Sequence, residues 1–161
     1  IEMGTPMKKV LNDIGGGFKE PIKALQIGGP LGGVIPLAEA EKLNLDFQEF
    51  TAAGFMLGHA SIVSIPKDFP MVEYIHHLFE FTAEESCGKC FPGRLGSYRG
   101  KEMFDQLKSK TAKIPLKVLN DLLLTMKNGC LCALCGAIPT PIMNILKYFG
   151  DEMKNDMVNE N

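Results

Sequence analysis

The sequence has no surplus of positive charge and no long apolar run. Its 161 residues include 17 Lys+Arg and 19 Asp+Glu, which gives a net charge of −2. Nucleic acids and anionic membranes are bound by clustered positive charge, so this balance argues against both partners. No apolar stretch reaches the ~18–20 residues of a transmembrane helix. Hydrophobic residues still make up 45% of the chain, which argues against wholesale disorder.

The chain also lacks a secretory signal and a recognisable catalytic set. It begins Ile1-Glu2-Met3, without an initiator methionine or a basic and apolar leader, so we interpret it as a processed piece or an excised fragment. Of its three histidines, His59 belongs to no Ser/His/Asp or Cys/His arrangement. Adjacent helical residues point about 100° apart, so His76 and His77 cannot share one metal-binding face, and we predict structural roles for them.

Cysteine, by contrast, is grouped: the five are Cys87, Cys90, Cys130, Cys132 and Cys135. An odd number without a secretory signal argues against a disulfide framework and favours a reducing compartment. Cys87–Cys90 and Cys132–Cys135 are both C-x-x-C pairs, and four thiolates suit tetrahedral zinc or an iron–sulfur cluster. Far more residues separate the pairs than the ~15–20 of a compact zinc ribbon.

Two other interpretations of the cysteines are weaker. A thioredoxin-like redox pair is disfavoured because Cys87 follows a predicted helix and no βαβ context surrounds it. Some of the cysteines could instead be buried apolar thiols, and for Cys130 this alternative stays evenly balanced with metal binding.

Short elements are predicted before a proline-flanked joint at residues 66–70. Apolar residues at Met7, Val10, Leu11 and Ile14 share one helical face. Strands are predicted at 23–27 and 61–65, and a helical turn within 46–54. The glycine-rich run 28–33 is predicted to be a loop, either a tight turn or a surface that approaches a neighbouring domain or ligand.

Beyond the joint, the apolar pattern changes to the helical period and predicts four amphipathic helices, the arrangement of a small bundle. The first runs into Cys87, the second follows Gly96, and the others begin at Pro115 and Pro141. The residues predicted to face inward are Val72, Ile75, Leu78, Phe79, Thr82, Tyr98, Met103, Phe104, Leu107, Leu116, Leu119, Leu122, Leu123, Met126, Ile142, Ile145, Leu146 and Phe149. The polar end of the chain is predicted to fray.

Three segments resemble a known family. Residues 85–96, E-S-C-G-K-C-F-P-G-R-L-G, closely resemble the E-S-C-G-K-C-x-P-C-R-x-G signature of the flavin- and NADH-binding subunit of NADH:quinone oxidoreductase. The diaphorase (beta) subunits of soluble NAD-linked formate dehydrogenases and hydrogenases share that signature. Residues 129–134, followed by Pro139-x-Pro141-Ile142, resemble the family's second cysteine loop. Residues 28–33 resemble the G-G-P-x-G-G of its β-grasp domain.

The resemblance implies an α+β fold in two domains. Residues 1–66 correspond to a small soluble-ligand-binding β-grasp (ubiquitin-like) domain whose first strand is missing. Residues 67–153 correspond to an all-α four-helix-bundle domain that binds a [4Fe-4S] cluster, and residues 154–161 form the frayed tail. The family's larger flavin- and nucleotide-binding domain has no counterpart in this chain.

The resemblance also implies the electron-transfer portion of a NAD-linked oxidoreductase. Single electrons would pass through the cluster between a flavin and partner iron–sulfur subunits. FMN and NAD would be bound by the absent N-terminal domain, so we do not expect this chain to be active alone. The implied location is the cytoplasm or the soluble arm of a membrane-associated complex. The alternative is a non-catalytic docking module with a zinc-stabilised or metal-free cysteine site.

One departure from the family motif affects the ligand set. Gly93 stands where the family has its third cluster cysteine, whereas Cys87, Cys90 and Cys132 match the other three ligands. We predict that Cys135 supplies the fourth ligand; a [3Fe-4S] cluster with an open corner and a zinc site stay open as alternatives. We expect Lys89 and Arg94 to tune the cluster electrostatically. We also expect a cysteine restored at position 93 to stabilise the cluster against oxygen.

Overall fold

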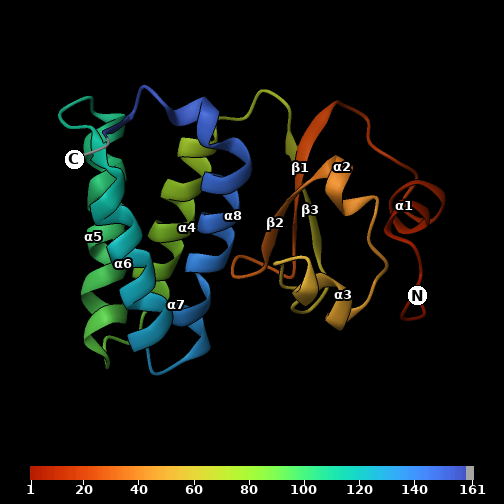
Figure 1. The fold of residues 1–161 in the computed structure, drawn as a ribbon, viewed down its shortest axis with the longest axis horizontal. Coiled ribbons are helices and arrows are strands. Elements are labelled where there is room, and N and C mark those ends of the chain that lie inside the picture. The colour runs from red at the N-terminus through yellow and green to blue at the C-terminus, as the bar shows by residue number, and fades with distance from the viewer. Residues whose placement is uncertain (159–161) are drawn as a thin grey trace. The chain divides into compact units, whose positions relative to one another are not determined.

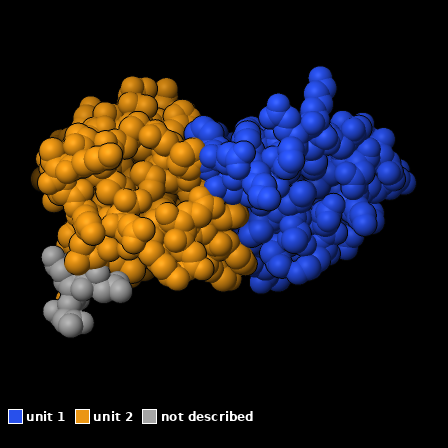
Figure 2. Space-filling view, turned by 90° about the horizontal axis from the view of Figure 1, so that it is seen from above, with its two compact units in different colours: residues 1–69 blue, residues 70–161 orange. Residues whose placement is uncertain are grey.

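The computed structural model describes residues 1–158 and divides the chain into two compact units, 1–69 and 70–161 (Figure 2). The division between Phe69 and Pro70 falls within the proline-flanked joint. We call the two parts the N-terminal unit and the helical unit. Among the described residues, none of the helices has the length and apolar character that crossing a membrane requires.

The N-terminal unit contains a three-stranded antiparallel sheet with the strand order β2-β1-β3 (Figure 1). Its elements in chain order are α1 (Met7–Lys9), η1 (Val10–Ile14), β1 (Ile22–Ile27), β2 (Gly33–Pro36), α2 (Leu37–Ala40), α3 (Phe47–Ala52) and β3 (Ile62–Pro66). Both predicted strands are present, as β1 and β3. The four-residue strand β2 directly follows the glycine-rich loop and was not expected.

The core of the N-terminal unit forms around the central strand β1. Leu25 and Ile27 on that strand are fully buried, and so are Ile35 from β2 and Phe50 from α3. Asp46 caps α3, because its carboxylate accepts hydrogen bonds from the backbone of the first turn. The prediction that Ile14 faces inward is wrong: it is 54% exposed, because η1 is wound as a π-helix and leaves the α-helical period.

The helical unit contains four long helices that contact one another in the cyclic order α4, α5, α6, α8. Its elements are α4 (Met71–Glu85), α5 (Phe91–Lys108), β4 (Ile114–Pro115), α6 (Leu116–Gly129), α7 (Ala133–Ala137), α8 (Pro139–Phe149), η2 (Gly150–Met153) and β5 (Met157–Val158). Helix α4 lies close to α5, since the ring of Phe79 packs directly on Gly100, where a side chain would collide with it. Phe79 also stacks against Phe104, with 5.8 Å between the ring centroids.

Helix α5 differs most from the prediction, since it begins at Phe91 instead of after Gly96. Pro92 occupies its first turn, where a missing backbone N–H costs nothing. The earlier start brings Gly93 into the helix and rotates Tyr98 outward, so Tyr98 is 60% exposed and its predicted inward position is wrong.

The structure adds two elements near the C-terminal end of the chain. The five-residue helix α7 lies within the second cysteine loop, and α8 begins at Pro139, two residues before the predicted start. Part of the predicted frayed tail is ordered, because Met157–Val158 pairs in parallel with Ile114–Pro115. The last three residues of that predicted tail lie outside the described residues.

A buried histidine joins α4 to α5 and predicts a small dependence of stability on pH. The carboxylate of Asp105 accepts a hydrogen bond from Nε2 of His76 (2.6 Å) and pairs with Nζ of Lys101 (3.1 Å). The hydrogen bond from His76 contributes most to holding the pKa of Asp105 below its usual 3.8. A lowered carboxyl pKa stabilises the folded state above pH 3.8, and this contribution is lost as the pH falls through the folded pKa.

We therefore expect Asp105→Asn to destabilise the helical unit at neutral pH by less than about 1 kcal/mol, because the carboxylate is half exposed and screened. The difference from the wild type should shrink as the pH falls below 4, where both side chains are neutral. Thermal unfolding at matched pH values measures it, with the exposed Asp121→Asn on α6 as control. A difference that grows on acidification would contradict the assignment.

Candidate metal centre

The cysteines lie at helix ends that meet at one end of the helical unit. Cys90 is the N-cap of α5, Cys130 the C-cap of α6, and Cys132 the N-cap of α7. Cys87 lies in the turn between α4 and α5, and Cys135 lies inside α7. Helix α7 contacts both α5 and α6, so two loops far apart in the sequence are brought together.

Gly93 marks the point at which the two loops meet. A Cβ atom built on Gly93 would lie 2.9 Å from Sγ of Cys90 and 3.0 Å from Sγ of Cys135. Position 93 therefore faces the sulfurs of both C-x-x-C pairs. The expectation that a single added cysteine at position 93 would stabilise the site is revised, because its side chain would enter space that these sulfurs already occupy.

Hydrogen bonds and burial divide the thiols into two kinds. The pKa of Cys90 is lowered first by a backbone hydrogen bond from Leu131 and then by one from Gly93, so the second loop stabilises the thiolate of the first. Burial is the largest cause that raises the pKa of Cys135, whose Sγ donates to Oγ of Ser86 at 3.9 Å. Burial also raises the pKa of Cys130 to about 12.

The predicted basic residues lie on the first loop. Nη1 of Arg94 donates a hydrogen bond to the carbonyl oxygen of Gly88 (3.3 Å), and its guanidinium lies 4.9 Å from the centroid of the Phe91 ring. Arg94 therefore supports the turn between Cys87 and Cys90, in addition to the charge expected of it. Lys89 is exposed in that turn.

The histidines take no part in this centre. His76 is paired with Asp105, and His77 is exposed on α4. His59 lies in the N-terminal unit beside Gly29. In the part of the chain that the structure describes, no group of three or more Cys, His, Asp or Glu side chains is arranged as the ligands of a single metal ion.

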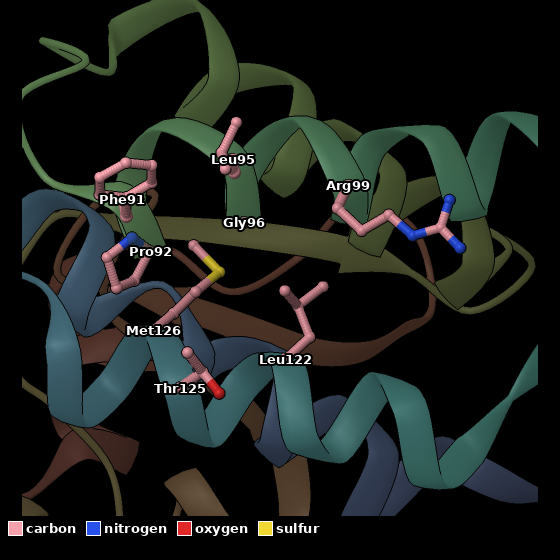
Figure 3. Close-up of a pocket in the computed structure, with 8 residues that line it drawn as sticks. All are labelled: Phe91, Pro92, Leu95, Gly96, Arg99, Leu122, Thr125 and Met126. Atoms are coloured by element: carbon pink, nitrogen blue, oxygen red, sulfur yellow. The ribbon is translucent and has the colours of Figure 1, made fainter.

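A feature that the sequence patterns did not indicate is an apolar pocket beside the centre. It has a volume of about 320 Å³ and lies between α5 and α6, lined by Phe91, Pro92, Leu95, Gly96, Leu122 and Met126, among others (Figure 3). The guanidinium of Arg99 points away from the other side chains along α5 in that view, and it pairs with Glu102 at 2.6 Å. The exposed fraction of Phe91, 68%, is the signal of an unfilled apolar surface.

The donor set fits an iron–sulfur cluster or a structural metal. Thiolate sulfur is the usual ligand of both, and the second loop supplies a backbone hydrogen bond that favours a thiolate at Cys90. The geometry thus defines a class: a helical domain that presents cysteines from two loops to one inorganic centre.

Comparison with known proteins identifies the family within this class. Residues 73–156 match the family model described as the NADH-ubiquinone oxidoreductase-F iron-sulfur binding region, and the chain belongs to that family. The resemblance found in the cysteine motifs is confirmed. The matched region lies in the helical unit and includes all five cysteines.

Curated relatives extend the similarity over most of the chain. The NADP-reducing hydrogenase subunit HndC of Solidesulfovibrio fructosivorans is 33% identical over 94% of this chain and 31% of its own length. The F-type subunit of the NADH-quinone oxidoreductase of Rickettsia bellii is 29% identical over 95% of this chain and 38% of its length. The chain therefore spans about a third of these relatives.

The fold is shared with a solved structure. A chain in the crystal structure of an NAD+-reducing [NiFe]-hydrogenase in the H2-reduced state aligns with a TM-score of 0.84 and 19% identity. The alignment covers 100% of this chain and 27% of that one. The mixed fold, with a small sheet before a helical unit, agrees with the predicted combination of helices and strands.

Proposed function

We propose that the helical unit holds a [4Fe-4S] cluster on Cys87, Cys90, Cys132 and Cys135 and serves as a single-electron relay in a NAD-linked oxidoreductase. The observation that carries the proposal is the meeting of the two cysteine loops at Gly93, where Sγ of Cys90 and of Cys135 would both lie within 3.0 Å of an added Cβ. Family membership supports the choice of an iron–sulfur cluster over another cysteine-bound group.

The protein's own residues would set the properties of this relay. An iron–sulfur cluster accepts and returns one electron at a potential that hydrogen bonds to sulfur and nearby charge adjust. The backbone hydrogen bond from Leu131 to Cys90 and the positive charge of Arg94 and Lys89 both favour added negative charge at the centre. These groups are expected to raise its potential.

The rest of the electron path would lie on other polypeptide. We propose that a flavin- and NAD-binding domain supplies FMN and NAD, and that partner iron–sulfur subunits exchange electrons with the cluster. Two relatives that extend far beyond this chain are named as subunits of an NADP-reducing hydrogenase and of an NADH-quinone oxidoreductase. On this basis the chain is not a complete enzyme, and it works in the cytoplasm or in the soluble arm of a membrane-associated complex.

The two units support matching structural roles. We propose that the N-terminal unit is a β-grasp domain without its first strand, and that α4, α5, α6 and α8 form the four-helix bundle of the cluster domain. The three-stranded antiparallel sheet and the cyclic contacts of the four helices support these assignments. In both cases the fold positions loops, which carry function more often than regular elements do.

A docking module without electron transfer is the second candidate. The apolar side chains beside the cysteine loops favour it, since Phe91 is 68% and Leu131 77% exposed. In that case the same four cysteines would hold zinc, or no metal, and would serve to stabilise the fold.

The amounts of iron, zinc and acid-labile sulfide per chain separate these candidates. They are measured on anaerobically purified protein, together with an electron paramagnetic resonance spectrum after reduction. We expect about four irons and four sulfides per chain, and a signal that appears on reduction. About three irons with a signal in the oxidised form would instead indicate an open corner and a [3Fe-4S] cluster. Stoichiometric zinc without sulfide would overturn the relay in favour of the docking module.

A further inference from the structure

Position 93 continues the spacing of the first cysteine pair but carries no side chain. Cys87, Cys90 and Gly93 are three residues apart, and Gly93 is buried in the first turn of α5. A Cβ added there would point at the sulfurs, 2.9 Å from Sγ of Cys90 and 3.0 Å from Sγ of Cys135. The helix therefore directs position 93 into the centre and leaves that place empty of its own atoms.

Cys135 fills the space that α5 leaves. It is 2% exposed, and its Cβ as well as its Sγ would lie within 3.2 Å of the added atom. The sulfur of a cysteine at position 93 would lie one bond further along the same direction. Two sulfurs would then compete for one volume, and core side chains of this size yield little space.

Cys130 is placed differently. Its Cβ would lie 3.7 Å from a Cβ built on Gly136, which is the residue after Cys135 in α7 and points about 100° away from it. Cys130 therefore packs against another side of α7 and does not share the space at Gly93. Its position as the C-cap of α6 gives it a structural role there.

We infer that Gly93 and Cys135 form one relocated ligand position: the glycine in α5 makes room, and α7 supplies the thiolate. The inference rests on the proposed metal centre and concerns which residue completes it. In this arrangement Gly93 is a positioning residue for Cys135. Either a cysteine at 93 or a cysteine at 135 can complete the site, but the two together crowd it.

A ligand-swap series tests this pair by metal and sulfide content per chain, with no need for enzyme activity. The series comprises the wild type, Cys135→Ala, Gly93→Cys and the double variant Gly93→Cys/Cys135→Ala. Alanine is used because serine oxygen can itself bind iron. We expect Cys135→Ala to lose more than half of the wild-type iron and sulfide. We expect the double variant to regain most of it, because the new thiol enters the emptied space.

Cys130→Ser is the matched control and should keep near wild-type iron content. Gly93→Cys alone is expected to hold less iron than the double variant, because of the crowding. Full iron in Cys135→Ala would overturn the inference, and so would a double variant no better than Cys135→Ala. If Cys130→Ser loses the cluster and Cys135→Ala does not, Cys130 is the fourth ligand.

The outcome for the proposed relay is read separately from the wild-type protein. If the wild type holds zinc without sulfide, the relay fails, but the same series followed by zinc content still decides the ligand pair. Iron in the wild type together with full iron in Cys135→Ala would overturn the ligand pair alone. A wild type without any metal would overturn both.

Discussion

Removal of the metal centre is expected to lower the unfolding temperature of the helical unit by at least about 10 °C. Metal binding to cysteines contributes directly to folding free energy, and about 1 kcal/mol shifts the unfolding temperature of a domain this size by ~4–8 °C. Helix α7 has five residues and little else to hold it, and both loops around it end on cysteines. Loss of the centre should therefore loosen α7 and the first turn of α5 first.

Hydrogen exchange measured by mass spectrometry shows where the loosening occurs. Protein with the centre removed by an anaerobic chelator is compared with untreated protein. We expect faster exchange in peptides from 86–96 and 129–138, with little change in the buried strand β1. The N-terminal unit serves as an internal control, since all five cysteines follow residue 86. Equal acceleration in both units, or none in the cysteine loops, would contradict the expectation.

The cysteine motifs predicted the family because thiolate spacing is local in sequence and tightly constrained by the chemistry of the centre. The strands β1 and β3 and the helices α4 and α6 could be predicted for a similar reason, since their apolar periodicity is long and regular. The four-residue strand β2 could not be, because it directly follows glycines whose local preference is a turn.

The start of α5 shows how packing can override local preference. Pro92, Gly93 and Gly96 indicate a loop when they are read in isolation. In the fold, each glycine lies where a side chain would collide. A Cβ on Gly96 would meet the side chain of Met126 at 2.9 Å, and one on Gly93 would meet two cysteine sulfurs. Glycine is thus selected here for close approach within a helix, which no single-chain pattern can show.

The fourth ligand illustrates the same limit at the site. The sequence shows that position 93 lacks a thiol and that two extra cysteines, Cys130 and Cys135, are present. It does not show which of the two approaches position 93, because helix α7 was unexpected. The five-residue helix turns Cys135 toward Gly93 and leaves Cys130 at the end of α6. The placement depends on about one turn of helix.

A methyl group at Gly32 is expected to destabilise the N-terminal unit by about 3 kcal/mol. The Cβ of Gly32→Ala would collide with the carbonyl oxygen of Ile27 and lie 2.7 Å from its carbon and 2.8 Å from Cα of Gly28. These are backbone atoms at the end of the central strand β1. They cannot move without disturbing the pairing of β1 with β2, in which Ile27 lies opposite Gly33.

The matched control is Gly54→Ala, which separates collision from backbone strain. Gly54 has φ +83 and no neighbour within 4 Å of an added Cβ, so alanine there costs about 1 kcal/mol for the left-handed conformation. Calorimetry should show a loss several degrees larger for Gly32→Ala, with metal content unchanged in both variants because the helical unit carries every cysteine. Equal losses would mean that β1 yields at Ile27 and that the glycine loop is adaptable, whereas a larger loss for Gly32→Ala would mean that it is a rigid hairpin closed by backbone contact.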